Sequence, residues 1–126
     1  MIYNEALKYF CSIKLFFELN TYIMSLKKQF LKSKPVCKVS FRLDAADASE
    51  ANSVQLLGDF NNWDKSAEPM AKLKSNDFTA VLELESGKDY QFRYYIDGSI
   101  WKNDPQADSY TSNSFGEENS VVSTIV

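Results

Sequence analysis

Apolar and polar residues alternate from Pro35 to the C-terminus, and this period of two constrains the fold more than any other feature of the sequence. Val39, Phe41 and Leu43 alternate with polar neighbours, as in a strand with one buried face. Turn residues separate several such segments, and no helical pattern lies among them. The sequence therefore predicts an all-β antiparallel sandwich or barrel, with strands at residues 36–43, 53–58, 78–85, 90–96, 99–103 and 120–126.

The first 34 residues differ from the rest of the chain in charge and in pattern. They contain six lysines and two glutamates, a net charge of +4, which leaves −7 for residues 35–126 of the −3 carried by the whole chain. Lys8, Lys14 and Glu18 interrupt the apolar runs, which argues against a signal peptide and against a membrane span. We expect residues 1–34 to be a helical or disordered N-terminal extension and residues 35–126 to form the sandwich domain.

This extension leaves two interpretations open. Met24 begins a run typical of the start of a small cytosolic protein, so a natural start at Met24 would make residues 1–23 an upstream segment. Alternatively, the aromatic and aliphatic residues of that segment form a helix that docks on a membrane surface or on a partner. Mass spectrometry of the native protein distinguishes the two starts.

Composition removes several classes of function. The chain has no His, which excludes Ser/His/Asp and Cys/His catalysis and histidine-ligated zinc or haem. Cys11 and Cys37 are too few for a four-thiolate zinc site or a disulfide scaffold, which favours a reducing, cytoplasmic compartment. An acidic domain repels phosphate backbones, so nucleic acid is not expected as a partner. We expect a neutral ligand, no metal and no cofactor.

Three short stretches are more specific than a generic sandwich. They are GDFNNWD at residues 58–64, FRYYIDG at residues 92–98 with Trp101 after it, and NSFG at residues 113–116 with Asn119 after it. Asn and Asp bond to nearby backbone groups and Gly adopts backbone conformations that other residues disfavour, so these stretches contain turns. The expected turn residues are Gly58, Asn61, Asn62, Asp97, Gly98 and Gly116.

The large side chains in these stretches each allow two interpretations. Trp63, in a polar turn, either closes one end of the core or binds a ligand. Trp101 follows a hairpin turn, and the alternation leaves either face of the sheet open to it. Arg93 lies on the non-core face of its strand, which on its own predicts a solvated side chain.

Taken together and in this order, the three stretches resemble the glycogen- and starch-binding domains of carbohydrate-binding module family 48. That family is related to the early-set, immunoglobulin-like domains that precede the catalytic barrels of isoamylases and branching enzymes, and it includes the glycogen-binding domain of the AMP-activated protein kinase β subunit. The resemblance covers about Val36 to Val126. It implies an immunoglobulin-like, early-set antiparallel β-sandwich of the isoamylase N-terminal type.

The resemblance also implies binding roles for five residues. Trp63 and Trp101 occupy the places of aromatic residues that stack on glucose rings. Arg93 and Asn119 occupy the places of residues that bond to sugar hydroxyls. Phe115 takes the place of an apolar residue that inserts into the glucan.

Two departures from the family pattern leave details of the site open. Ser99 and Ile100 make the turn before Trp101 one residue longer than in the kinase-type domain. Glu117 stands near the place of a small hydroxyl residue, so the hydrogen-bonding set, and whether Glu117 weakens binding, are not fixed by the resemblance.

Sequence and resemblance together predict a non-catalytic module that binds α-1,4-glucans such as glycogen, starch and maltooligosaccharides. A glucan is uncharged and presents an apolar C–H face on each ring, which suits indole rings supported by a few polar side chains. Glycoside hydrolases use paired carboxylates, but the candidates lie in turn signatures and no (β/α) barrel accompanies them; they are Asp59, Asp64, Asp97 and Asp104. The alternative is a regulatory module of the same fold that docks a kinase, a glycan enzyme or a second copy of itself.

Overall fold

The computed structural model describes residues 24–125, so the expected extension lies outside the described residues as far as residue 23. Strands account for nearly all of the regular structure, together with one short 3₁₀ turn. In chain order these elements are β1 (Leu26–Phe30), β2 (Val36–Leu43), β3 (Val54–Gly58), η1 (Asp59–Asn61), β4 (Ala71–Lys72), β5 (Phe78–Glu85), β6 (Asp89–Ile96), β7 (Ile100–Lys102), β8 (Ser109–Ser112) and β9 (Glu118–Ser123).

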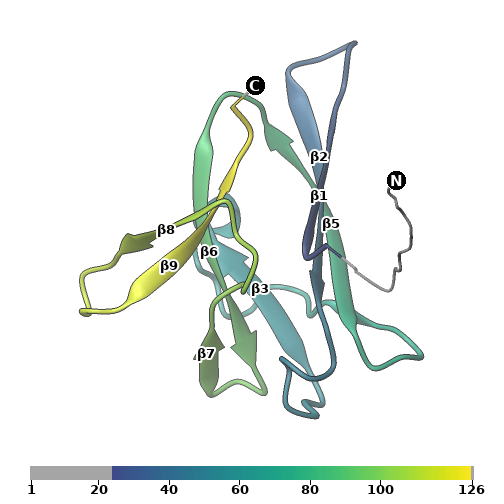
Figure 1. Cartoon of the computed structure of the whole chain (residues 1–126), viewed down its shortest axis with the longest axis vertical. Coiled ribbons are helices and arrows are strands. Elements are labelled where there is room, and N and C mark those ends of the chain that lie inside the picture. The colour runs from purple at the N-terminus through teal and green to yellow at the C-terminus, as the bar shows by residue number, and fades with distance from the viewer. Residues whose placement is uncertain (1–23, 126) are drawn as a thin grey trace, which may run out of the picture.

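The strands form two antiparallel sheets that face each other (Figure 1). One sheet has the order β1-β2-β5-β4, and the other has the order β3-β6-β9-β8. In the second sheet β9 pairs with Asp89–Phe92 at the start of β6, whereas β7 pairs with Tyr94–Ile96 at its end. The predicted all-β antiparallel sandwich is confirmed, and β6 is the central strand of the second sheet, where it pairs with β3, β7 and β9.

The first sheet begins earlier in the chain than the sequence predicted. β1 lies within the residues assigned to a helical or disordered extension, yet it pairs with β2 from Leu26 opposite Phe41 to Phe30 opposite Cys37. Only Leu26 of β1 is buried, so the strand has no alternating pattern by which it could be recognised. Residues 26–30 are therefore a strand, and neither helical nor disordered, while the division of the chain into domains stays a prediction.

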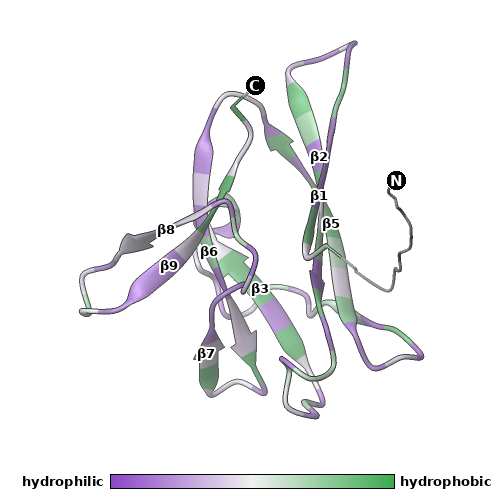
Figure 2. Cartoon of the chain, viewed as in Figure 1, coloured by the Kyte–Doolittle hydropathy of each residue, from purple (hydrophilic) through white to green (hydrophobic). Residues whose placement is uncertain are grey.

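The core lies between the sheets and follows the predicted alternation. The buried side chains of β2 are Cys37, Val39, Phe41 and Leu43, and they pack against buried residues of β6 across the sandwich. The rings of Phe41 and Phe92 pack edge to face with their centroids 5.2 Å apart. Figure 2 shows the apolar residues alternating with polar ones along the strands. Cys37 is a free thiol, and burial raises its pKa.

A buried polar cluster fastens the start of β1 to the opposite sheet. The fully buried carboxylate of Asp104 accepts hydrogen bonds from the hydroxyls of Tyr94 at 2.7 Å and Ser25 at 2.6 Å, and from the backbone N–H of Gln106 at 2.8 Å. Burial, followed by the charge of Asp104 and the hydrogen bond to it, raises the pKa of Tyr94 well above its ordinary value. The backbone carbonyl of Ser25 in turn accepts the N–H of Arg42 in β2. Ser25 thus links the two sheets just ahead of β1.

The hairpin between β6 and β7 has the expected turn residues at its tip. Asp97 and Gly98 both have left-handed backbone, with φ of 50° and 69°, which is the conformation of the tight turns that suit twisted strands. Asp97 also accepts the backbone N–H groups of Asn52 and Ser53 through Oδ1. The turn therefore fixes both the return of the chain into β7 and the entry into β3.

Candidate functional site

A groove of about 800 Å³ crosses the outer face of the second sheet. It collects side chains from the turn after η1, from β6 and β7, from the loop between β8 and β9, and from the ends of these two strands next to the loop. The five residues predicted to bind ligand all line it, and so does Glu117. The lining residues are Trp63, Lys65, Gln91, Arg93, Trp101, Ser112, Asn113, Ser114, Phe115, Glu117 and Asn119.

The turn after η1 holds Trp63 at one side of this groove. Asn61 closes the turn, since its Oδ1 accepts the N–H of Gly58 at 3.0 Å and its Nδ2 donates to the carbonyl of Leu56 at 2.9 Å. Asn62 and Trp63 both have left-handed backbone, with φ of 58° and 57°. The indole Nε1 of Trp63 donates to Asp59 Oδ1 at 3.2 Å. Trp63 lies half-buried outside the core cluster, so it lines the groove and does not close the sandwich.

Trp101 stands beside Trp63 on the same face of the sheet. It is paired in register with Tyr95, and their ring centroids are 4.3 Å apart. The rings of Trp63 and Trp101 lie edge to face with centroids 6.2 Å apart. The ammonium of Lys65 lies 4.9 Å from the centroid of Tyr95 and 5.7 Å from that of Trp101. The hairpin therefore places Trp101 on the groove side, which the alternation alone left open.

Arg93 is buried and not solvated, which corrects the expectation from its place on the strand alone. It does point away from the core, opposite Leu57 in β3, but other residues of that face cover it. Its guanidinium carbon lies 4.8 Å from the ring centroid of Trp101, and Nη1 donates to Glu117 Oε1 at 3.0 Å. Its Nε is buried and has no hydrogen-bond partner within residues 24–125. Arg93 is thus held beneath the groove by an aromatic ring and a carboxylate, whose own side chain is 62% exposed.

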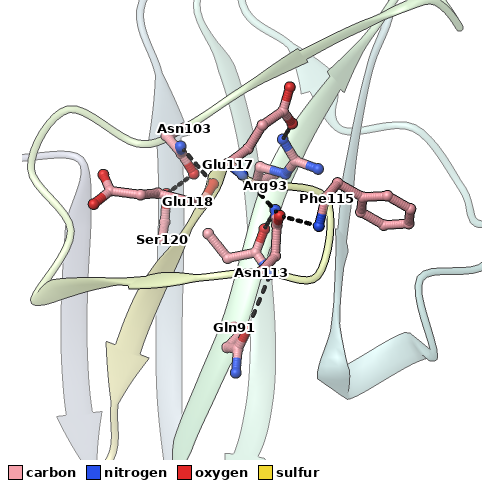
Figure 3. Close-up of polar contacts among 9 residues, drawn as sticks. Gln91, Arg93, Asn103, Asn113, Phe115, Glu117, Glu118 and Ser120 are labelled. Atoms are coloured by element: carbon pink, nitrogen blue, oxygen red, sulfur yellow. Dashed lines mark hydrogen bonds and ion pairs between the residues drawn. The ribbon is translucent and has the colours of Figure 1, made fainter.

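A row of amide side chains connects the loop between β8 and β9 with β6 (Figure 3). Asn113 Oδ1 accepts the backbone N–H groups of Phe115 at 2.9 Å and Glu117 at 3.1 Å. Asn113 Nδ2 donates to Asn119 Oδ1 at 3.0 Å, and Asn119 Nδ2 donates to Gln91 Oε1 at 2.9 Å. This loop presents Phe115 with 83% of its surface exposed. The predicted residue Asn119 therefore lies in the middle of the row.

Sequence analysis missed five lining residues that carry polar groups, namely Lys65, Gln91, Ser112, Asn113 and Ser114. Gln91 lies two positions before Arg93, so the period of two places it on the same face, and this signal was available. Asn113 begins the NSFG stretch, but only the structure reveals its link to Asn119. Lys65 follows Trp63 by two positions in an irregular loop, where no sequence pattern predicts the direction of a side chain.

The carboxylates considered for catalysis have structural partners instead. Asp59 accepts the N–H of Gln91 as well as the indole of Trp63, and Asp104 is buried in the cluster described above. Asp64 accepts the N–H and hydroxyl of Ser66, which together lower its pKa. Within the described part of the chain, no group of three or more acidic, Cys or His side chains could hold a metal ion. The same residues include no helix with the length and hydropathy needed to span a bilayer.

Comparison with protein families assigns most of the described chain to one family. Residues 47–125, more than half of the chain, match the family described as the glycogen recognition site of AMP-activated protein kinase. This range contains every residue that lines the groove. No curated protein matches the chain.

Proposed function

We propose that this chain, which belongs to the family of the glycogen recognition site of AMP-activated protein kinase, binds α-1,4-glucans in the groove of its second sheet. Family membership makes it a carbohydrate-binding domain of the glycogen-recognition type. We further propose that glucose rings stack on the side chains of Trp63 and Trp101. Glycogen, starch and maltooligosaccharides share this chemistry.

The observation that carries the proposal is the pair of indoles in one groove. Trp63 comes from the turn after η1 and Trp101 from β7, and their ring centroids lie 6.2 Å apart at an interplanar angle of 61°. Two tilted platforms suit a helical α-glucan better than they suit a flat, extended glucan, because successive glucose rings of a helical α-glucan do not lie in one plane. Indoles also lose little conformational entropy on binding, since each has only two side-chain torsions to fix.

Polar side chains of the groove supply orientation. Arg93 and Asn119 carry donors that suit sugar hydroxyls, and each is already fixed by a neighbour, Arg93 by Glu117 and Asn119 by Gln91. Phe115 is the most exposed large apolar residue described, and we assign it the apolar contact at the open rim. A flexible sugar loses freedom when it is ordered in such an open groove, so the affinity is expected to be modest.

We propose further that the domain does not hydrolyse its ligand. Its family is a carbohydrate-binding one, and the acidic residues near the groove bond to the protein itself. Repurified protein incubated with glycogen should release no reducing ends. Release that disappears on replacing a single carboxylate would overturn this. A free buried thiol at Cys37 accords with a cytoplasmic location, which is likewise a proposal.

Native gel electrophoresis with glycogen in the matrix tests the binding function. The wild type should be retarded, and Trp63→Ala should weaken retention at least about tenfold, because burying one indole face contributes roughly 1.5–3 kcal/mol. Phe30→Ala is the matched control, since Phe30 is a partly exposed aromatic residue of the other sheet and should leave retention unchanged. A folded wild type that runs unretarded, and gives no heat with maltoheptaose, would favour a protein-docking role instead.

A further inference from the structure

The direction of the hydrogen bonds along the row of amides is fixed by the backbone at one end. The N–H groups of Phe115 and Glu117 can only donate, so the atom of Asn113 that faces both of them is its oxygen. Asn113 must then present Nδ2 to the next side chain, and the atom of Asn119 that receives it is Oδ1. The turn at residues 113–117 thus determines which way two successive amides point.

The orientation of Asn119 also determines the orientation of the Gln91 side-chain amide. Asn119 turns Nδ2 toward β6, where the oxygen Oε1 of Gln91 accepts it at 2.9 Å. Gln91 is therefore left with the two N–H groups of Nε2, which have no acceptor within residues 24–125. Its backbone is fixed too, because the N–H of Gln91 donates to Asp59 Oδ2 at 2.8 Å, and Asp59 is the residue that holds the Trp63 indole. An oriented amide with unused donors lines the groove near the proposed platforms.

We propose that Gln91 binds the glucan directly, through donation from Nε2 to a sugar oxygen, and that Asn113 is the positioning residue that sets this orientation. The proposal rests on the proposed function and adds a residue to it. It also gives the groove a polarity. Gln91, Arg93 and Lys65 all present donors, so the glucan oxygens that face this side of the groove act as acceptors.

Two substitutions at Gln91 separate direct binding from support of Asn119. Gln91→Glu keeps an oxygen that accepts from Asn119 Nδ2 and removes both outward donors, whereas Gln91→Met removes donors and acceptor together. If Gln91 donates to the sugar, both variants should bind maltoheptaose about tenfold more weakly than the wild type by calorimetry, with unchanged melting temperature for Gln91→Glu. Loss in Gln91→Met alone would show that Gln91 only supports Asn119, and it would overturn the proposal, as would wild-type binding by both.

A titration of the ¹⁵N-labelled wild type with maltoheptaose distinguishes failure of this proposal from failure of the function. The indole N–H signals of Trp63 and Trp101 report on the platforms, and the side-chain NH₂ signals of Gln91, assigned by their absence in Gln91→Glu, report on the amide. Movement of both sets is the expected result. Movement of the indole signals alone would leave the glucan function standing and overturn the role of Gln91. If neither set of signals moves, both the glucan-binding function and the role of Gln91 are overturned.

Asn113→Asp tests the positioning role from the other end of the row. A carboxylate still accepts the two backbone N–H groups, but its second oxygen can no longer donate to Asn119. Asn119 should then turn its Nδ2 toward the new carboxylate and its oxygen toward Gln91, which turns in response and exposes Oε1 to the groove. We expect Asn113→Asp to reproduce the loss of affinity of Gln91→Glu and to shift the Gln91 NH₂ signals before any ligand is added. Unshifted signals together with wild-type affinity would contradict the positioning role.

Discussion

Replacing Asp104 with Ala is expected to lower the free energy of unfolding by about 3–5 kcal/mol, a large part of the stability of a domain of this size. The substitution leaves the hydroxyls of Tyr94 and Ser25 and the N–H of Gln106 without the acceptor they share. Tyr94 is completely buried, so its hydroxyl cannot turn to water for a replacement. Each buried donor left unpaired costs roughly 1–3 kcal/mol. Urea denaturation followed by tryptophan fluorescence measures the loss.

Two milder variants test whether the carboxylate acts through these bonds. Asp104→Asn keeps the shape and one acceptor, and the hydroxyls can rotate to accept from its NH₂, so it should lose less than Asp104→Ala. Tyr94→Phe removes a single donor to a buried carboxylate and should cost about 1.5–3 kcal/mol. Equal losses for Asp104→Ala and Tyr94→Phe would show that the bond to Tyr94 is the whole contribution of Asp104, contrary to a cluster in which Ser25 and Gln106 also depend on it.

The parts of the fold that the sequence predicted well are those whose strands have one buried and one exposed face. The expected strands at residues 36–43 and 78–85 coincide with β2 and β5. β1, β4 and β8 escaped prediction because none of them has an alternating pattern: only Leu26 of β1 is buried, β4 has two residues, and β8 is the polar segment SYTS. These three strands lie at sheet edges and are held by backbone pairing with one neighbour, whereas the edge strand β3 buries apolar residues and was predicted.

Sequence motifs predicted part of the lining of the groove but none of the contacts within it. Motifs placed Trp63, Trp101 and Asn119 in stretches far apart in the chain, and the second sheet brings them to one groove. The alternating pattern correctly predicted that Arg93 points away from the core. It did not predict that Arg93 is buried, because Trp101 in β7 and Glu117 in the loop before β9 contact its side chain. The direction of the hydrogen bonds determines whether Gln91 presents a donor or an acceptor to a ligand, and this direction depends on contacts between residues that are distant in the sequence.

Gly58→Ala is expected to lower both stability and glycogen binding, because the added Cβ would clash with neighbouring atoms and not because of backbone torsion. Gly58 has φ of −174°, extended backbone that any residue adopts. A Cβ at this position would lie 2.5 Å from the carbonyl oxygen of Gln91 and 2.8 Å from the Cβ of Phe92. Neither atom is the end of a flexible side chain, so β3 and β6 would have to separate. Overpacking of this kind typically costs about 1–3 kcal/mol.

Gly87→Ala is the matched control, because Gly87 has φ of +84° and nothing within 4 Å of the added Cβ. It should cost about 1 kcal/mol through torsional strain and leave glycogen retention unchanged. Gly58 differs because its carbonyl accepts the N–H of Trp63 and its N–H donates to Asn61, so displacing Gly58 displaces the platform. We therefore expect Gly58→Ala to lose glycogen retention under conditions where it is still folded. A destabilised Gly58→Ala that binds like the wild type would show that the turn carries Trp63 independently of its contact with β6.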